Sequence, residues 1–167
     1  MNGIQFRANR VVLIPPANVG NATATSDVIN MKDCPVATIV LQFGALHDSS
    51  DSDLVVLGND STTASGGTAL ATLKYRIQET TGTWGAWTKV TDSKIDIVTG
   101  GDIDPATADD AIMEIELNAS DIEAGTTGDK YFYMTLSAPG QTSWNLSAHA
   151  VMNNQRYQAD IPESVVV

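Results

Sequence analysis

Hydrophobic and polar residues alternate with a period of two along several stretches of the chain. The clearest is 70–79, where Leu73, Tyr75 and Ile77 point one way and the polar residues between them point the other way. This pattern is typical of a strand with one buried face. The stretch 36–43 is apolar on both faces, which predicts a central strand. The same signs predict strands at 111–117, 131–136 and 144–152, and shorter ones at 28–31, 87–90 and 94–98.

Turn-forming residues separate these stretches. Helical periodicity is weak, and we expect a single helical turn at 118–125 that ends at Gly125. About seven or eight strands joined by turns predict an all-β fold, an antiparallel β-sandwich that is jelly-roll-like. The gaps, rich in Gly, Asp, Asn, Ser and Thr, are 47–53, 58–67, 80–85, 99–109 and 123–129.

The two ends of the chain differ from its middle. Residues 1–17 contain a short apolar run before Pro15 and Pro16, and proline cannot donate to a sheet ladder, so we expect an extended N-terminal arm or an edge strand. Residues 18–157 form the predicted sandwich domain, and 158–167 a C-terminal tail. Apolar ends of this kind often add to a neighbouring chain, which predicts a homo-oligomer. The residues expected to bind a partner there are Val11, Val12, Leu13, Ile14, Val165 and Val166.

Charge narrows the range of partners. The 167 residues hold 9 Lys and Arg against 20 Asp and Glu, a formal net charge of -11. A nucleic-acid surface needs clustered cations, so we expect no nucleic-acid partner, and the acidic field favours a basic one. The apolar run at 11–14 is too short for a signal peptide or a membrane span, which predicts a protein folded in a cytoplasm with no membrane partner. Cys34 is the single cysteine and is expected to be a small buried residue.

Catalytic groups are scarce in the sequence. His47 and His149 are the two histidines; His47 falls in a polar loop and His149 on the outward side of a strand. None of the common nucleophile, phosphate-loop or metalloprotease motifs is present. Glu114 and Glu116 share a strand face, but any alternating strand with a polar side produces that spacing. We therefore expect a non-enzymatic protein without a cofactor.

Two kinds of loop leave alternatives open. The acidic loops at 47–53 and 102–110 could wrap calcium through oxygen ligands, although they lack the spacing of a known calcium loop and equally suit solvated turns. Trp84 and Trp87 flank a turn, where indoles stack on sugars in a carbohydrate- or receptor-binding module. The alternative is that they cover the end of the core or an oligomer contact. Trp144 lies on the apolar side of a predicted strand and is assigned to the core.

Several segments together resemble a family of small virion proteins of tailed bacteriophages. They are the "N-M-K" turn at 30–32, the apolar strand closing in Phe-Gly-Ala at 43–45, the Lys-Tyr-Phe-Tyr strand beginning at Lys130, and Asn-Gln-Arg-Tyr at 154–157 before Pro162. The resemblance implies a head decoration, or cement, protein. Such a protein binds the major capsid protein on the virion surface, often as a trimer, after assembly in the host cytoplasm. The strong acidity and long polar loops depart from the family and leave head, neck and tail open.

Overall fold

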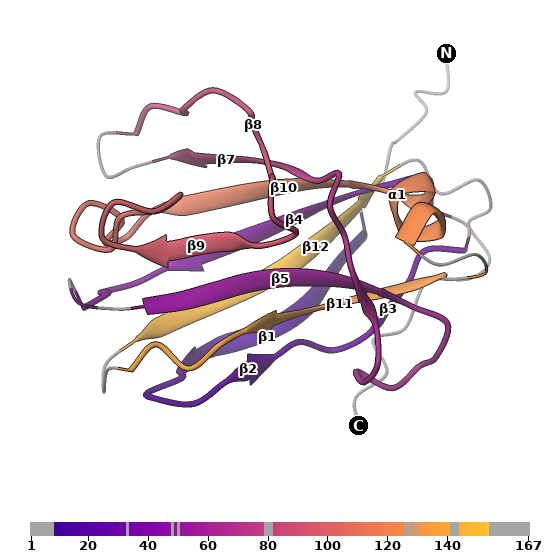
Figure 1. Ribbon diagram of the computed structural model, residues 1–167, viewed down its shortest axis with the longest axis horizontal. Helices are drawn as coiled ribbons and strands as arrows, with labels where there is room; N and C mark the ends of the chain where they lie inside the picture. The colour runs from indigo at the N-terminus through magenta and orange to yellow at the C-terminus, as the bar shows by residue number, and fades with distance from the viewer. Residues whose placement is uncertain are drawn as a thin grey trace, which may run out of the picture.

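The computed structural model describes residues 9–32, 34–47, 49, 51–78, 82–125, 128, 130–140 and 144–153. These residues form two antiparallel β-sheets and one short helix (Figure 1). Sheet A has the order β1-β12-β4-β10-β7-β8: Asn9–Asn18, Asn145–Asn153, Val36–Phe43, Ile112–Asn118, Lys74–Gln78 and Thr88–Lys89. Sheet B has β2 and β3 beside β11, then β5, then β6 and β9: Ala24–Thr25, Ile29–Asn30, Tyr131–Leu136, Asp51–Asn59, Thr68–Ala69 and Ile95–Val98.

Strands near the start of the chain pair with strands near its end, in nested order. The first strand, β1, pairs with the last, β12; β2 and β3 pair with β11; β4 pairs with β10; and β5 pairs with β9. The chain is thus one long antiparallel hairpin. It is rolled up so that β12 also meets β4 and β11 also meets β5. A rolled hairpin of this kind is the jelly roll, so the expected all-β sandwich is confirmed.

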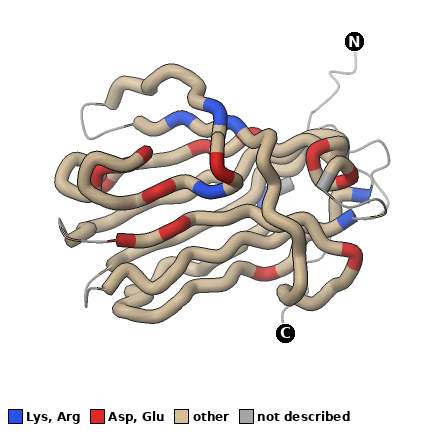
Figure 2. Tube along the Cα trace, viewed as in Figure 1, with Lys and Arg blue, Asp and Glu red and all other residues tan. Residues whose placement is uncertain are grey.

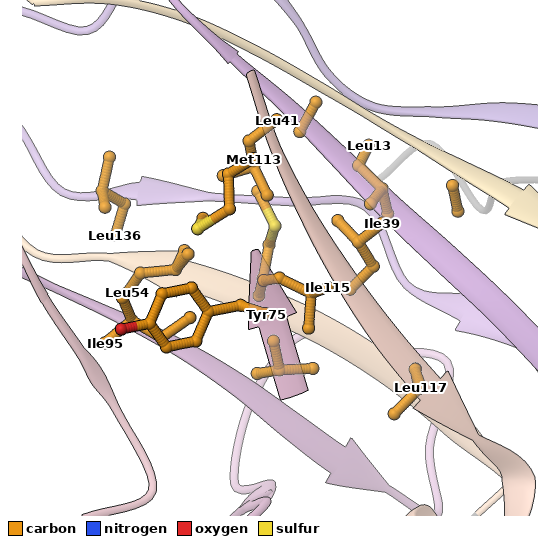
Figure 3. Close-up of a cluster of buried hydrophobic side chains, with 14 of the residues drawn as sticks. Leu13, Ile39, Leu41, Leu54, Tyr75, Ile95, Met113, Ile115, Leu117 and Leu136 are labelled. Carbon is orange, nitrogen blue, oxygen red and sulfur yellow. The ribbon is translucent and has the colours of Figure 1, made fainter. Parts of the chain in front are cut away.

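The core lies between the two sheets and is built by the inward residues of the alternating strands. Figure 3 shows Leu41 and Met113 of sheet A near Leu54 and Leu136 of sheet B. All of these side chains are buried. Each buried aliphatic side chain contributes about 1.5–3 kcal/mol to the folded state. Trp144 and Cys34 are also buried in this core, as expected.

Helix α1, Ala119–Gly125, closes one end of the sandwich and contacts both β5 and β10. It confirms the predicted turn at 118–125. Ile122 anchors it in the core. Asp121 caps it, because its Oδ2 accepts the backbone N–H of Asn118 at 3.0 Å, and its Oδ1 accepts the hydroxyl of Thr72 at 2.9 Å.

Strand β5 was absent from the sequence prediction, which placed turns at 47–53 and 58–67. It is a central strand of sheet B. Its inward residues include Ser52 and Gly58, which broke the apolar pattern, and its outward residues include Asp53, which an ion pair holds. Residues 51–53 and 58–59, which the sequence assigns to turns, are therefore the two ends of this strand.

Strand β1 matches the edge-strand alternative of the sequence analysis within its bounds. Residues 9–18 pair with β12 along their length as the edge strand of sheet A. Two bulges interrupt the pairing. The first turns both Leu13 and Ile14 into the core, and the second accommodates Pro15 and Pro16. A strict period of two does not allow for an inserted residue, so the sequence pattern predicts neither bulge.

Candidate interaction surface

The outward face of sheet A carries two rows of residues that cross five strands. Strand register places Val12, His149, Val40, Glu114 and Arg76 in the first row. The second row consists of Arg10, Val151, Thr38, Glu116 and Lys74. Directly opposite residues on neighbouring strands lie close enough for their side chains to interact. Along both rows, β1, β12 and β4 form one part of this face, and β10 and β7 form the other part.

The first part lacks negative charge. None of the chain's 20 acidic residues lies in β1, β12 or β4. Figure 2 shows the acidic residues in red on other parts of the fold. We call the six outward residues of these strands in the two rows the carboxylate-free face: Arg10, Val12, Thr38, Val40, His149 and Val151.

Val12 stands out on this face because it is 55% exposed, whereas its neighbours Val11 and Leu13 are buried. His149 lies opposite Val12 in the register and is half-buried. Burial lowers the pKa of His149, and the positive charge of Arg10 lowers it further. The imidazole is therefore kept neutral at physiological pH. The result is a mostly uncharged surface on an acidic protein.

The other end of the same face holds a cluster of two indoles around one cation. The Arg76 Cζ lies 4.5 Å from the ring centre of Trp84 and 4.7 Å from that of Trp87. Glu114 fixes the guanidinium, since its Oε2 accepts from Nε at 2.8 Å and from Nη2 at 2.5 Å. Contacts of a cation with aromatic faces are stabilising at these distances. We call Arg76, Trp84, Trp87 and Glu114 the Trp–Arg cluster.

The turn before β8 holds the indoles in place. Gln78 forms an isolated bridge with Trp84, and its side chain donates to the carbonyl of Gly82 at 2.7 Å. The backbone N–H of Gly85 donates to the carbonyl of Ile77 at 2.8 Å. Trp87 is 42% exposed, and Trp84 is half-buried. The cluster therefore presents a positioned, partly exposed aromatic surface.

The residues predicted to bind a partner thus fall into three groups. Val11, Leu13 and Ile14 belong to the protein's own core, and Val12 remains exposed. Trp84 and Trp87 come together on Arg76. Val165 and Val166 lie outside the described residues. Sequence reasoning missed Arg76 and Glu114 as a pair, because their contact depends on the register between β7 and β10.

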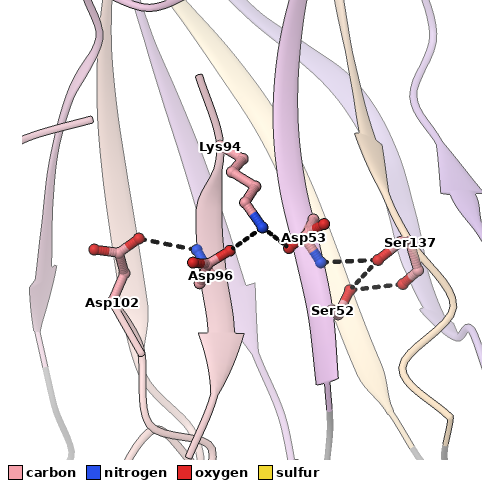
Figure 4. A network of polar contacts seen from close by, with 6 residues as sticks. All are labelled: Ser52, Asp53, Lys94, Asp96, Asp102 and Ser137. Atoms are coloured by element: carbon pink, nitrogen blue, oxygen red, sulfur yellow. Dashed lines mark hydrogen bonds and ion pairs between the residues drawn. The ribbon is translucent and has the colours of Figure 1, made fainter. Parts of the chain in front are cut away.

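The acidic loops are engaged in contacts within the protein. Figure 4 shows Lys94 between Asp53 and Asp96, with Nζ–Oδ1 distances of 3.0 and 2.8 Å. These hydrogen bonds raise the pKa of Lys94, and the bond from Lys94 lowers the pKa of Asp96. Asp102 accepts the backbone N–H of Asp96 at 2.9 Å. The network connects β5 with β9 and the following loop.

Asp102 also accepts the hydroxyl of Tyr75 at 3.1 Å. Burial of the phenol, and next the negative charge of Asp102, raise the pKa of Tyr75 to about 12. Within the described residues, no group of three or more His, Cys, Asp or Glu side chains is placed to hold a metal ion. Asp48 and Ser50 of the 47–53 loop lie outside those residues.

The remaining candidates for chemistry also have structural partners. His47 is exposed, and its Nδ1 accepts the backbone N–H of Ser49 at 3.2 Å. The Cys34 thiol donates to the carbonyl of Val36 at 3.0 Å. Glu114 binds Arg76, while Glu116 lies opposite Lys74 and Thr38 in the register. In the part of the chain that the structure describes, no helix has the length and hydropathy to cross a bilayer.

No family model matches this chain, and no curated protein matches it. Among solved structures it is similar to the SPBc2 prophage-derived protein YomS, with a TM-score of 0.45, 9% identity, and coverage of 92% of this chain and 99% of that chain. It is similar to the Yersinia pseudotuberculosis-derived mitogen, with a TM-score of 0.31, 11% identity, and coverage of 92% and 94%. A chain of the infectious bursal virus derived T=1 particles has a TM-score of 0.28, 10% identity, and coverage of 96% of this chain and 44% of that chain.

Proposed function

We propose that this chain is a non-enzymatic structural protein of a tailed-bacteriophage virion. It decorates and cements the capsid by binding the major capsid protein as a homo-oligomer. The observation that carries the proposal is the Trp–Arg cluster, because tryptophan and arginine are the residues in which the binding energy of protein interfaces concentrates. Here both types are held in position before any partner arrives, which reduces the entropy lost on binding.

The chemistry of the described residues supports a binding role over a catalytic one. Three groups that catalysis could use are engaged in contacts that stabilise the fold: Glu114 with Arg76, Asp102 with Tyr75, and Cys34 with a backbone carbonyl. The jelly roll provides a rigid support, and a homo-oligomer on a capsid repeats its contacts. Repeated contacts raise the total affinity without any reaction.

Co-sedimentation with capsids assembled from the phage's major capsid protein tests the proposal. Wild-type protein should sediment with the capsids, and Trp87→Ala should lower the affinity at least about tenfold, as expected for an interface tryptophan. Trp87→Phe should retain part of the affinity because it keeps an aromatic ring. The neighbouring exposed residue provides a matched control, Thr88→Ala, which should bind like wild type. Absence of binding by the wild-type protein at low and at moderate salt would contradict the proposal.

The second candidate is a carbohydrate- or receptor-binding module of a phage tail. The exposed surface of Trp87, 42% of the residue, favours it because sugar rings stack on open indoles. The close contact of both indoles with Arg76 leaves less aromatic surface free for a sugar. Titration calorimetry against a glycan panel distinguishes the two functions. Sugar binding that disappears in Trp84→Ala and Trp87→Ala, with no capsid binding, would replace the capsid role with this one.

A further inference from the structure

The carboxylate-free face differs from the rest of the molecule in charge. Net charge -11 means that two copies of the chain repel each other at most orientations. Like charges brought together across an interface weaken binding strongly. A surface without carboxylates avoids this repulsion, and β1, β12 and β4 provide one over three adjacent strands.

The same face offers apolar area at its centre. Val12 is 55% exposed, and Val40 and Val151 are half-buried outward residues on the two neighbouring strands. His149 lies between Val12 and Val40 in the register. Its environment keeps it uncharged near neutral pH. Depletion of charge with apolar residues at the centre is the composition of an interface core.

We propose that the carboxylate-free face is where a second copy of this chain packs, in a two-fold symmetric contact. In such a contact both copies use the same surface. A two-fold axis along β12 places Val12 of each copy against Val40 of the other and His149 against His149, because β1 and β4 flank β12. Glu114 and Glu116, on the next strand, then lie at the margin of the contact.

This inference rests on the proposed function in that an oligomeric decoration protein needs a self-contact. It assigns different surfaces of sheet A to different partners. The second copy occupies the β1 side, and the Trp–Arg cluster on the β7 side stays open to the capsid. The contact gives a dimer, whereas the family resemblance implies a trimer, so the mass of the assembly distinguishes them.

Light scattering over a range of concentrations is the first test. Wild-type protein should approach twice its monomer mass of 17.7 kDa. Val12→Asp and Val151→Asp each place two carboxylates in the contact, one per copy, and should raise the dissociation constant about a hundredfold. The matched control is Val55→Asp, because Val55 is a half-buried outward valine on β5 of sheet B. It should dimerise like wild type, and circular dichroism should show folded strands in all variants.

Cross-linking is the second measurement and does not depend on a destabilising charge. His149→Cys should form dimers rapidly with a short bismaleimide, since packed sheets lie about 10 Å apart. Val55→Cys should not, and wild-type Cys34 is buried and should not react.

Three results would overturn the inference. They are a wild-type mass of 17.7 kDa at every concentration, a trimeric mass, or Val12→Asp and Val151→Asp variants that associate like wild type. Dimerisation that appears only after deletion of residues 158–167 would assign the face to the chain's own tail. Capsid co-sedimentation separates the two proposals: a trimer that binds capsids contradicts this inference alone, and a dimer that does not bind capsids contradicts the proposed function alone.

Discussion

Arg76 illustrates how individual residues acquire their roles through the sheet. In the sequence it is one polar residue of an alternating strand. In the fold, the register with β10 places Glu114 opposite it. The two indoles that sequence reasoning selected are 8 and 11 positions away along the chain, yet both contact its guanidinium. The two tryptophans could thus be selected as candidate binding residues from the sequence. Their shared cation could not, because pairing between strands is a property of the folded sheet.

His149 makes stability depend on pH in a defined direction. In the folded state its pKa is lowered from the ordinary value of 6.5, by burial first and by the charge of Arg10 second. Glu114 lies two strands away in the same row. The unfolded chain therefore takes up a proton more readily than the folded one. This stability is present above pH 6.5 and is lost as the pH falls through the folded-state pKa.

Urea denaturation at pH 7.5 and 5.5, the two sides of a histidine's usual pKa of about 6.5, measures this effect. The free energy of unfolding should fall more between these values in wild type than in His149→Gln. His47→Gln is the control for the loss of an imidazole, because His47 is exposed. Identical profiles for wild type and His149→Gln would show that the histidine is not desolvated.

At the scale of elements, the sequence predicted strands whose apolar pattern is uninterrupted. The bounds of β4 and β11 agree with the predicted stretches 36–43 and 131–136. β5 was missed because Asp53 and Gly58 are residue types common in turns. In the fold, Asp53 forms an ion pair with Lys94, and Gly58 pairs with β11. The bulges in β1 could not be predicted either. They depend on how the strand fits β12, which local composition does not determine.

Helix α1 depends on one capping residue. Asp121→Ala removes acceptors for the backbone N–H of Asn118 and for the hydroxyl of Thr72, so the free energy of unfolding should fall by about 1 kcal/mol. Glu123→Ala, on the exposed side of the same helix, should change it by less than about 0.5 kcal/mol. Thermal or chemical unfolding measures both. Equal effects of the two substitutions would argue against the cap.

The whole molecule combines a strong negative charge with one face free of it. At 0.1 M salt, repulsion between exposed charges more than about 10 Å apart is largely screened. Contact between two acidic copies should therefore tighten as salt rises. Contact with a basic capsid surface should weaken under the same change, because there the charges attract.

Measuring both dissociation constants at about 0.05 M and 0.5 M salt tests this opposition. The constant for self-association should fall with salt, and the constant for capsid binding should rise. The Val55→Asp variant, which adds a charge away from both surfaces, should shift neither trend. Constants that move in the same direction would mean that one of the two contacts is not governed by net charge.

The diproline and the two bulges of β1 affect how readily the protein aggregates through the edge of sheet A. An open strand edge is a template on which further strands can add without limit, and this is how amyloid-like fibres grow. Pro15 and Pro16 have no N–H to offer, and the bulges break the regular spacing of the edge. The β1 edge of sheet A is therefore a poor template for a further strand, which lowers the tendency of the protein to aggregate at high concentration.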